Sequence, residues 1–151
     1  MEKVTQFSIF LANKAGVLSQ IFREMAKSKV NISALALMDA AEHGVLRMVT
    51  SDADEARRGL SGLNLPVTET DCLAVTLANK PGAVADVCEK LAESHINVSY
   101  LYCTAGAPGG KTLAVLKVPD IKKAIKVLEN SSKTTGRDMK AKLRRPVTRK
   151  R

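Results

Sequence analysis

Two short turns of the same type, Asn13-Lys14-Ala15-Gly16 and Asn79-Lys80-Pro81-Gly82, hold the residues best suited to chemistry. Each follows an alternating, strand-like run and precedes a helical pattern, so each lies where a strand passes into a helix. The first turn of a helix has N–H groups without intrahelical partners and a partial positive charge, which together suit a carboxylate. Glycine lets a backbone approach a ligand closely, and asparagine can cap the helix or bond polar groups. Both turns are therefore candidate carboxylate sites, although a simple tight turn needs the same residues.

The turns belong to an internal repeat with an offset of 66 residues. Leu11-Ala12-Asn13-Lys14-Ala15-Gly16 recurs as Leu77-Ala78-Asn79-Lys80-Pro81-Gly82, and no gap is needed between residues 7 and 37. Farther along, Asn31 matches Asn97 at the start of the next strand-like run. We expect that asparagine to lie near the same end of the sheet as the turn. Repeats at a fixed period indicate duplicated structural units.

The order of elements in each copy is β-α-β-β-α-β. In the first copy, strands are expected near 7–11, 32–38, 46–49 and 66–70, with helices near 17–25 and 53–63. The second copy repeats this order but has no clear closing strand, which we expect to be short, poor or borrowed from elsewhere. This order predicts an α+β fold of two ferredoxin-like modules packed as a pair, each an antiparallel sheet with helices on one face. We assign residues 1–70 to the first module, 71–132 to the second and 133–151 to a basic, disordered C-terminal tail.

A strand, Asn-Lys-Pro-Gly, an amphipathic helix and then Ile-Asn-Val closely resemble the ACT domain, a regulatory module that binds amino acids. The resemblance covers about residues 4–130 as a tandem pair. It implies an effector bound where two ACT domains meet, at the turn after the first strand and the start of the second. Carried onto this chain, the ligand-binding positions are Asn13, Lys14, Ala15, Gly16, Val17, Asn31, Ile32, Asn79, Lys80, Pro81, Gly82, Ala83, Asn97 and Val98. Ala15 stands where many members of the family have proline. The resemblance therefore allows a looser first turn, with only one of the two sites able to bind the effector.

The net charge of +9 lies almost entirely in the tail. Residues 133–151 hold nine lysines or arginines against one acid, whereas the other 132 residues hold 15 basic and 14 acidic side chains. A solvated tail is the simpler interpretation, although loose binding to phosphates stays open. The RNA-binding RRM domain shares the β-α-β-β-α-β order but stacks bases on aromatic residues of its central strands. Here Tyr100 and Tyr102 lie elsewhere, and we expect them at the seam between copies or beside a ligand.

Sites for catalysis, metals or cofactors are not indicated. The three cysteines are widely spaced and interpreted as small core residues of a reducing compartment, and the two histidines have no partner at ligand spacing. Gly109-Gly110-Lys111-Thr112 is interpreted as a hairpin, because a phosphate-binding loop needs glycine where Ala105 stands. No apolar run approaches the roughly 18 residues of a membrane-spanning helix. We expect a cytoplasmic protein with no membrane or nucleic acid partner.

The sequence therefore predicts a non-catalytic sensor that binds an amino acid, or a similar carboxylate metabolite, between two ACT modules. We expect a homo-oligomer and allow for a metabolic enzyme as partner. Two alternatives stay open: a regulatory subunit that docks on an enzyme without a ligand of its own, and an RNA-binding protein that uses the sheet and the tail.

Overall fold

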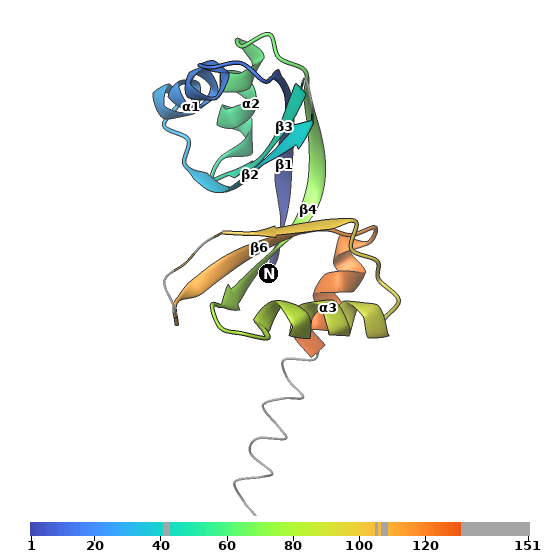
Figure 1. The fold of residues 1–151 in the computed structure, drawn as a ribbon. Coiled ribbons are helices and arrows are strands. Elements are labelled where there is room, and N and C mark those ends of the chain that lie inside the picture. The colour runs from blue at the N-terminus through green and yellow to red at the C-terminus, as the bar shows by residue number, and fades with distance from the viewer. Residues whose placement is uncertain (41–42, 105, 107–108, 131–151) are drawn as a thin grey trace, which may run out of the picture.

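Six antiparallel strands form a single curled sheet in the computed structural model, which describes residues 1–40, 43–104, 106 and 109–130 (Figure 1). Their order across the sheet is β2-β3-β1-β4-β6-β5. The elements are β1 (Glu2–Ala12), α1 (Val17–Lys27), β2 (Ile32–Ala40), β3 (His43–Thr50), α2 (Ala53–Ser61), β4 (Val67–Ala78), α3 (Ala83–Glu93), β5 (Tyr100–Cys103) and β6 (Lys111–Lys117). Residues 121–130 form a further helix.

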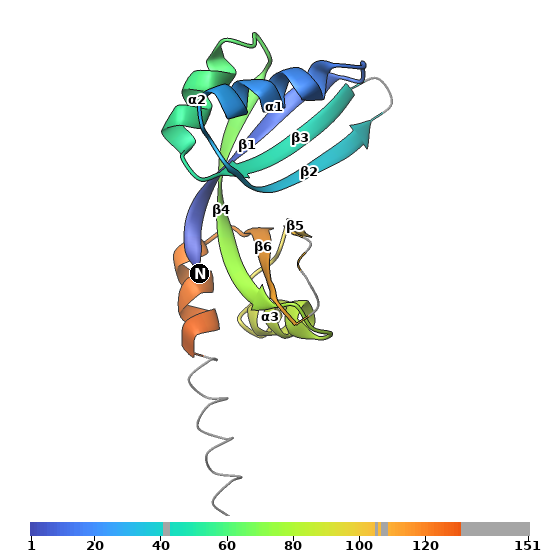
Figure 2. The same ribbon diagram turned by 90° about the vertical axis from the view of Figure 1, so that its left-hand side faces the viewer.

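Each half of the sheet has its own layer of helices and its own aliphatic core. Helices α1 and α2 cover the half containing β2 and β3, and α3 with the helix of residues 121–130 covers the half containing β5 and β6 (Figure 2). In the first half, Ile21 and Met25 of α1 are buried against the sheet. In the second, Val87 and Leu91 of α3 take the same role. The expected pair of ferredoxin-like α+β modules is confirmed.

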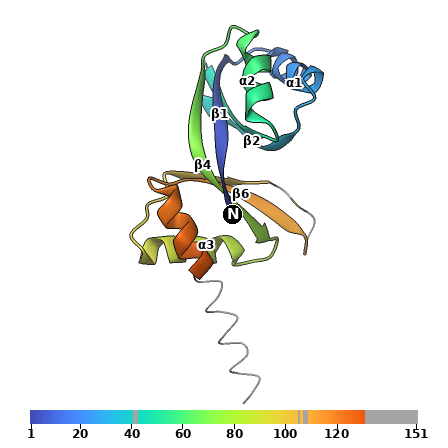
Figure 3. The same cartoon turned by 180° about the vertical axis from the view of Figure 1, so that it is seen from behind.

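Strands β1 and β4 run through both halves and join them (Figure 3). They pair antiparallel from Glu2 opposite Ala74 to Ile9 opposite Val67, while residues 6–12 of β1 also pair with β3. Residues 67–70 of β4 thus close the first half, as expected. Residues 2–5 of β1 close the second half, beside the part of β4 that pairs with β6. The expected borrowed strand therefore comes from the start of the chain.

The helix-free faces of the two halves meet in a third buried cluster. Its buried members are Ala34, Val49, Cys72 and Val115, and its partly buried members are Val4, Tyr100, Tyr102 and Leu113. The two tyrosines come from β5 of the second half, while Ala34 belongs to β2 of the first. The small alanine leaves room for the rings, because interiors are close-packed. The tyrosines lie at the seam between the copies, as the sequence predicted.

Gln6 is fully buried at the centre of this seam. Its Nε2 donates to the Tyr100 hydroxyl at 3.0 Å and to the Ser8 hydroxyl at 3.1 Å. Its Oε1 accepts from the Tyr102 hydroxyl at 3.1 Å and from the Cys72 thiol at 3.7 Å. Cys72 is the counterpart of Gln6 under the 66-residue offset, so equivalent positions of the repeat meet here. A buried amide needs such partners, because leaving it unpaired costs about 1–3 kcal/mol.

The expected boundary at residues 70 and 71 falls inside β4, and it stays a proposal for the junction of the two copies. The tail at residues 133–151 lies outside the described residues. Within the part of the chain that the structure describes, no helix is long and apolar enough to cross a membrane.

Candidate functional site

The two glycine turns have the same backbone conformation. Gly16 has φ 93° and ψ −21°, and Gly82 has φ 87° and ψ −20°, both in the left-handed region that favours glycine. In each turn the N–H of the lysine donates to the carbonyl two residues earlier, at 2.8 Å for Lys14 and 2.9 Å for Lys80. The repeat in sequence therefore produces a repeat in geometry.

The glycines, and not the asparagines, occupy the N-cap positions of α1 and α3. Neither helix has a side-chain hydrogen bond at its cap. The N–H of the first helical residue donates to the carbonyl of the turn lysine, at 3.4 Å for Val17 and 3.3 Å for Ala83. The N–H groups that follow have no capping side chain, and the start of each helix carries a partial positive charge. A β-carbon placed on Gly16 or Gly82 would meet nothing within 4 Å, so space lies open beside both turns.

A cavity of about 200 Å³ adjoins the first turn. Asn13 and Lys14 supply its polar wall, and Leu11, Leu18, Leu37 and Met38 supply its apolar wall; Gly44 completes the lining. A β-carbon at Gly44 would lie 3.4 Å from Leu11 Cδ1 and 3.5 Å from Leu37 Cδ1, so the missing side chain keeps this space. The cavity thus combines an amide and an ammonium group with aliphatic side chains. Ala15, Gly16 and Val17 follow directly along the chain.

The second turn is tied to the loop between β5 and β6. Asn79 Nδ2 donates to the Gly106 carbonyl at 2.8 Å, and the Asn79 N–H donates to the Gly110 carbonyl at 2.8 Å. Gly106 lies so close to the Lys111 carbonyl that a β-carbon there would clash. The expected hairpin at Gly109-Gly110 is confirmed, since these residues lead directly into β6. The Asn79 amide is therefore engaged within its own half, whereas the first turn borders a cavity.

Asn31 and Ile32 lie at the opposite end of the sheet from the first turn, so the expectation that they share one end is wrong. Helix α1 returns the chain across the sheet, and β2 then runs parallel to β1. Ile32 is therefore opposite Thr50, whereas the end of β1 pairs with His43. The Asn31 N–H donates to Ser51 Oγ at 3.1 Å.

The same topology separates Asn97 and Val98 from the second turn. Ser99 donates its N–H to the Lys117 carbonyl at 2.9 Å, at the far end of β6 from Lys111. Ile32 and Val98 pack against the cores of their own halves. Each module thus brings together only the turn residues, and the second pair of motif residues is remote within that module.

Leu37, Met38 and Gly44 are site residues that the motif did not indicate. Their signal in the sequence is faint: β2 is apolar at successive positions, which is unusual for a strand with one solvated face. The structure shows that β2 is an edge strand of the sheet. Leu35, Leu37 and Met38 are 48%, 49% and 40% exposed there. An exposed apolar edge strand is a template for pairing with another chain.

The thiols of Cys72 and Cys103 are not activated as nucleophiles. Burial raises the pKa of Cys72, and partial desolvation raises the pKa of Cys103, which keeps both thiols protonated near neutral pH. Cys72 is buried as expected, but the prediction of core positions is wrong for Cys88 and Cys103, which are exposed. The spacing of the cysteines did not reveal this, because the exposure of Cys88 on α3 and of Cys103 on the short edge strand β5 depends on the tertiary structure. In the described ranges, no group of three or more His, Cys, Asp or Glu residues could hold a metal.

Comparison with solved structures supports the fold over most of the chain. A protein of Bacteroides thetaiotaomicron shares 32% identity, with a TM-score of 0.78 over 86% of this chain and 89% of that one. The ligand-free regulatory subunit of aspartate kinase from Thermus thermophilus shares 10% identity, with a TM-score of 0.63 over 85% and 91% of the two chains. Aspartate kinase from Synechocystis shares 19% identity, with a TM-score of 0.58 over 85% of this chain and 26% of that one. The two kinase likenesses show the fold alone.

No curated protein matches the chain in sequence. A family model for the ACT domain pair, however, matches residues 2–139. Because the match takes in both glycine turns and both shared strands, the chain belongs to the ACT domain pair family, a class of regulatory module.

Proposed function

We propose that this protein is a non-catalytic sensor that binds an amino acid at the first glycine turn. The ligand carboxylate accepts hydrogen bonds from the N–H groups at the start of α1, where the helix dipole favours an anion. The amide of Asn13 holds the ligand's polar groups beside it. The observation that carries this proposal is the cavity that adjoins the turn and is lined by both Asn13 and Lys14.

The lining of that cavity favours an aliphatic amino acid. Its volume of about 200 Å³ lies below the roughly 300–1,000 Å³ of sites for drug-sized ligands, which suits a single small metabolite. Leu11, Leu18 and Leu37 offer no hydrogen bonds to a ligand side chain, so a charged or amide side chain would lose its hydration there without replacement. Leucine, isoleucine, valine and methionine are therefore the expected effectors.

A second copy of the chain completes the site in this proposal. Asn31 is at the other end of its own sheet and reaches a ligand at the first turn only from another molecule. Antiparallel pairing of two β2 edges about a two-fold axis brings Asn31 of one copy to the Asn13 turn of the other. The exposed Leu35 and Leu37 support this, because they become buried when the edges pair. Effector binding then stabilises the pair and changes the surface offered to a metabolic enzyme.

The seam gives no support to the RNA-binding alternative. An RRM domain presents aromatic rings on an open sheet face. Here the hydroxyls of Tyr100 and Tyr102 are hydrogen-bonded to Gln6, and both rings pack in the cluster between the halves.

Thermal unfolding with each of the twenty amino acids at millimolar concentration tests the proposal. A ligand at 100 times its dissociation constant adds about 2.7 kcal/mol to the free energy of unfolding. For a chain of this size that raises the midpoint by roughly 5–11 °C. We expect the shift with aliphatic amino acids and not with aspartate or lysine. Equal midpoints across the whole panel would contradict the assignment.

A further inference from the structure

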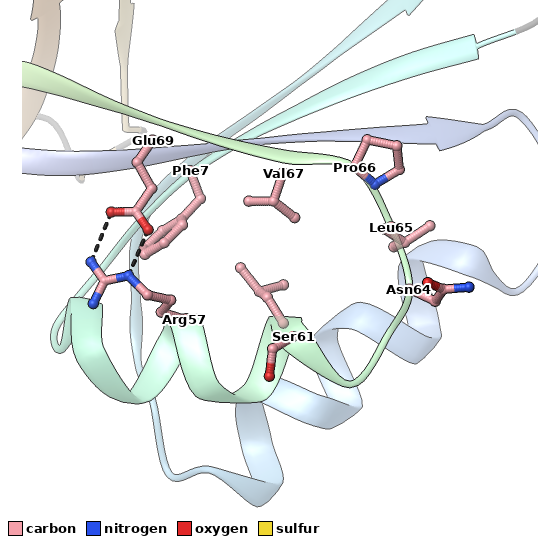
Figure 4. Close-up of a pocket in the computed structure, with 9 residues that line it drawn as sticks. Phe7, Arg57, Ser61, Asn64, Leu65, Pro66, Val67 and Glu69 are labelled. Atoms are coloured by element: carbon pink, nitrogen blue, oxygen red, sulfur yellow. Dashed lines mark hydrogen bonds and ion pairs between the residues drawn. The ribbon is translucent and has the colours of Figure 1, made fainter.

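A second and larger cavity lies between α2 and the start of β4 (Figure 4). Its volume is about 540 Å³, within the range of small-molecule sites. Phe7, Leu60, Leu65 and Val67 give it an apolar floor. It shares no lining residue with the cavity at the first glycine turn, so the two are separate features of the first half.

An ion pair closes one end of this cavity. Arg57 Nε and Nη2 donate to the two carboxylate oxygens of Glu69 at 2.6 and 2.7 Å (Figure 4). A third donor, Nη1, is 2.6 Å from Asp54 Oδ1. The hydrogen bond from Arg57 lowers the pKa of Glu69, so the carboxylate stays charged at neutral pH. The guanidinium of Arg57 is thus hydrogen-bonded to the carboxylates of Glu69 and Asp54, and it attracts an anionic ligand only weakly.

The other end of the cavity receives the C-terminus of α2, which ends at Ser61. Helix C-termini carry unpaired carbonyl oxygens and a partial negative charge. One carbonyl, that of Leu60, accepts the Leu63 N–H at 3.1 Å, and Ser61 Oγ donates to another, that of Arg58, at 2.7 Å. Asn64, with φ 53°, turns the chain at this mouth. Each of these carbonyls keeps a second lone pair, and the helix dipole is negative at this end, so the polar end of the cavity favours a hydrogen-bond donor or a cation.

The second half of the protein provides an internal comparison for this position. Asp52 and Asp120 cap equivalent helices, since each Oδ1 accepts the N–H three residues later at 2.9 Å. With this offset of 68 residues, Leu60 corresponds to Leu128, and both are buried. Arg57 corresponds to Ile125, which packs on the core of the second half. An aliphatic side chain therefore covers the core where the first half has an arginine turned toward its ion-pair partner.

We propose that the cavity between α2 and β4 is a second ligand site, which takes a small molecule with an apolar body and a hydrogen-bond-donating amine or alcohol head. The apolar body lies on Phe7, Leu60 and Val67, where Ile125 supplies the protein's own cover in the other half. The head group lies toward Ser61 and the end of α2. A carboxylate head is disfavoured, because it would face the negative end of the helix.

Three indoles with one body and different heads test this site in the full chain: tryptamine, tryptophol and indole-3-acetate. Chemical-shift changes of the backbone amides locate each ligand, and titration gives its dissociation constant. We expect tryptamine and tryptophol to shift residues 57–69 with a dissociation constant of about 1 mM or tighter, as suits ligands of this size. Indole-3-acetate should bind about tenfold more weakly.

Arg57→Ile copies the arrangement of the second half, where Ile125 packs on the core, and lays an aliphatic side chain over the apolar floor of the cavity. It should weaken tryptamine binding by about tenfold or more, a loss of about 1.4 kcal/mol. Arg58→Ile is the matched control, since Arg58 is the next residue of α2, also pairs with an acid, and does not line the cavity. Ser61→Phe fills the other end and replaces Arg57→Ile if that variant does not fold.

The proposal is overturned if the amine and the alcohol leave the amide signals of residues 57–69 unshifted, or if Arg57→Ile binds tryptamine as the unaltered protein does. Equal losses for the Arg57 and Arg58 variants would also overturn it. Amino acid binding at the first glycine turn should survive in Arg57→Ile, so failure of this site and failure of the sensor function are distinguishable.

Discussion

Three glycines allow the effector site to be separated from the general effect of backbone strain. Gly16, Gly82 and Gly109 all have positive φ, at 93°, 87° and 77°, and a β-carbon at each would meet nothing within 4 Å. Replacing any of them with valine therefore introduces similar strain and no clash of the β-carbon. Gly16 and Gly82 are in the two candidate turns. Gly109 is in the β5–β6 loop, where its N–H donates to the Asn79 carbonyl at 3.3 Å, so it serves as the control for the first turn alone.

The strain can be estimated from the left-handed backbone. Holding a non-glycine residue in that region costs about 1–2 kcal/mol. For a chain of this length, each kcal/mol lowers the midpoint of thermal unfolding by roughly 2–4 °C. All three variants should therefore melt roughly 2–8 °C lower than the unaltered protein. Only Gly16→Val should also lose effector binding, because its side chain stands beside the first N–H groups of α1.

The loss appears in the ligand-induced shift. An effector at 100 times its dissociation constant stabilises the unaltered protein by about 2.7 kcal/mol, and a tenfold weaker one stabilises it by about 1.4 kcal/mol. The shift should therefore fall to about half or less in Gly16→Val and stay whole in Gly109→Val. If Gly16→Val keeps the full shift while Gly82→Val loses it, the effector binds at the second turn. If all three variants keep it, neither turn holds the ligand.

Three further outcomes follow from the seam and the edge strand. Gln6→Ala removes the shared partner of two tyrosine hydroxyls, and we expect urea unfolding to show a free energy of unfolding lower by about 2–4 kcal/mol. A decrease of less than about 0.5 kcal/mol, which is typical of surface substitutions, would show that the network is not stabilising. Leu37→Lys puts a charge on the exposed edge of β2, and sedimentation should show a shift from dimer to monomer; an unchanged dimer would exclude this edge. Burial raises the pKa of Tyr102, with smaller effects from Cys72 and Tyr100, so the folded state holds its proton more tightly than the unfolded state. The stabilisation is complete below about pH 10, the ordinary value for tyrosine, and declines above it by up to about 1.4 kcal/mol per pH unit. Tyr102→Phe should flatten that decline, and an unchanged slope would assign it to other groups.

The local conformations could be predicted from the sequence because their causes are local. Gly16 and Gly82 fix left-handed turns, since other residues adopt that backbone at a cost, and the apolar spacing of residues 17–25 defines which face of α1 is buried. Asp52 starts α2 by accepting N–H groups two and three residues later. The 66-residue repeat similarly predicted two modules of one fold, because the same spacing of apolar residues buries the same faces of the strands and helices.

Tertiary structure decided which remote segments meet. Residues 2–5 close the second half because they lie beside residues 71–74 of β4 at the seam. No pattern in residues 2–5 predicts which strand they pair with. The direction of β2 placed Asn31 at the far end from the Asn13 turn, although the two stand 18 positions apart in one motif. Gly44 and Met38 reached the first turn through strand register alone. Pairing energies of this kind depend on sheet order and packing, which a sequence constrains only through the whole fold.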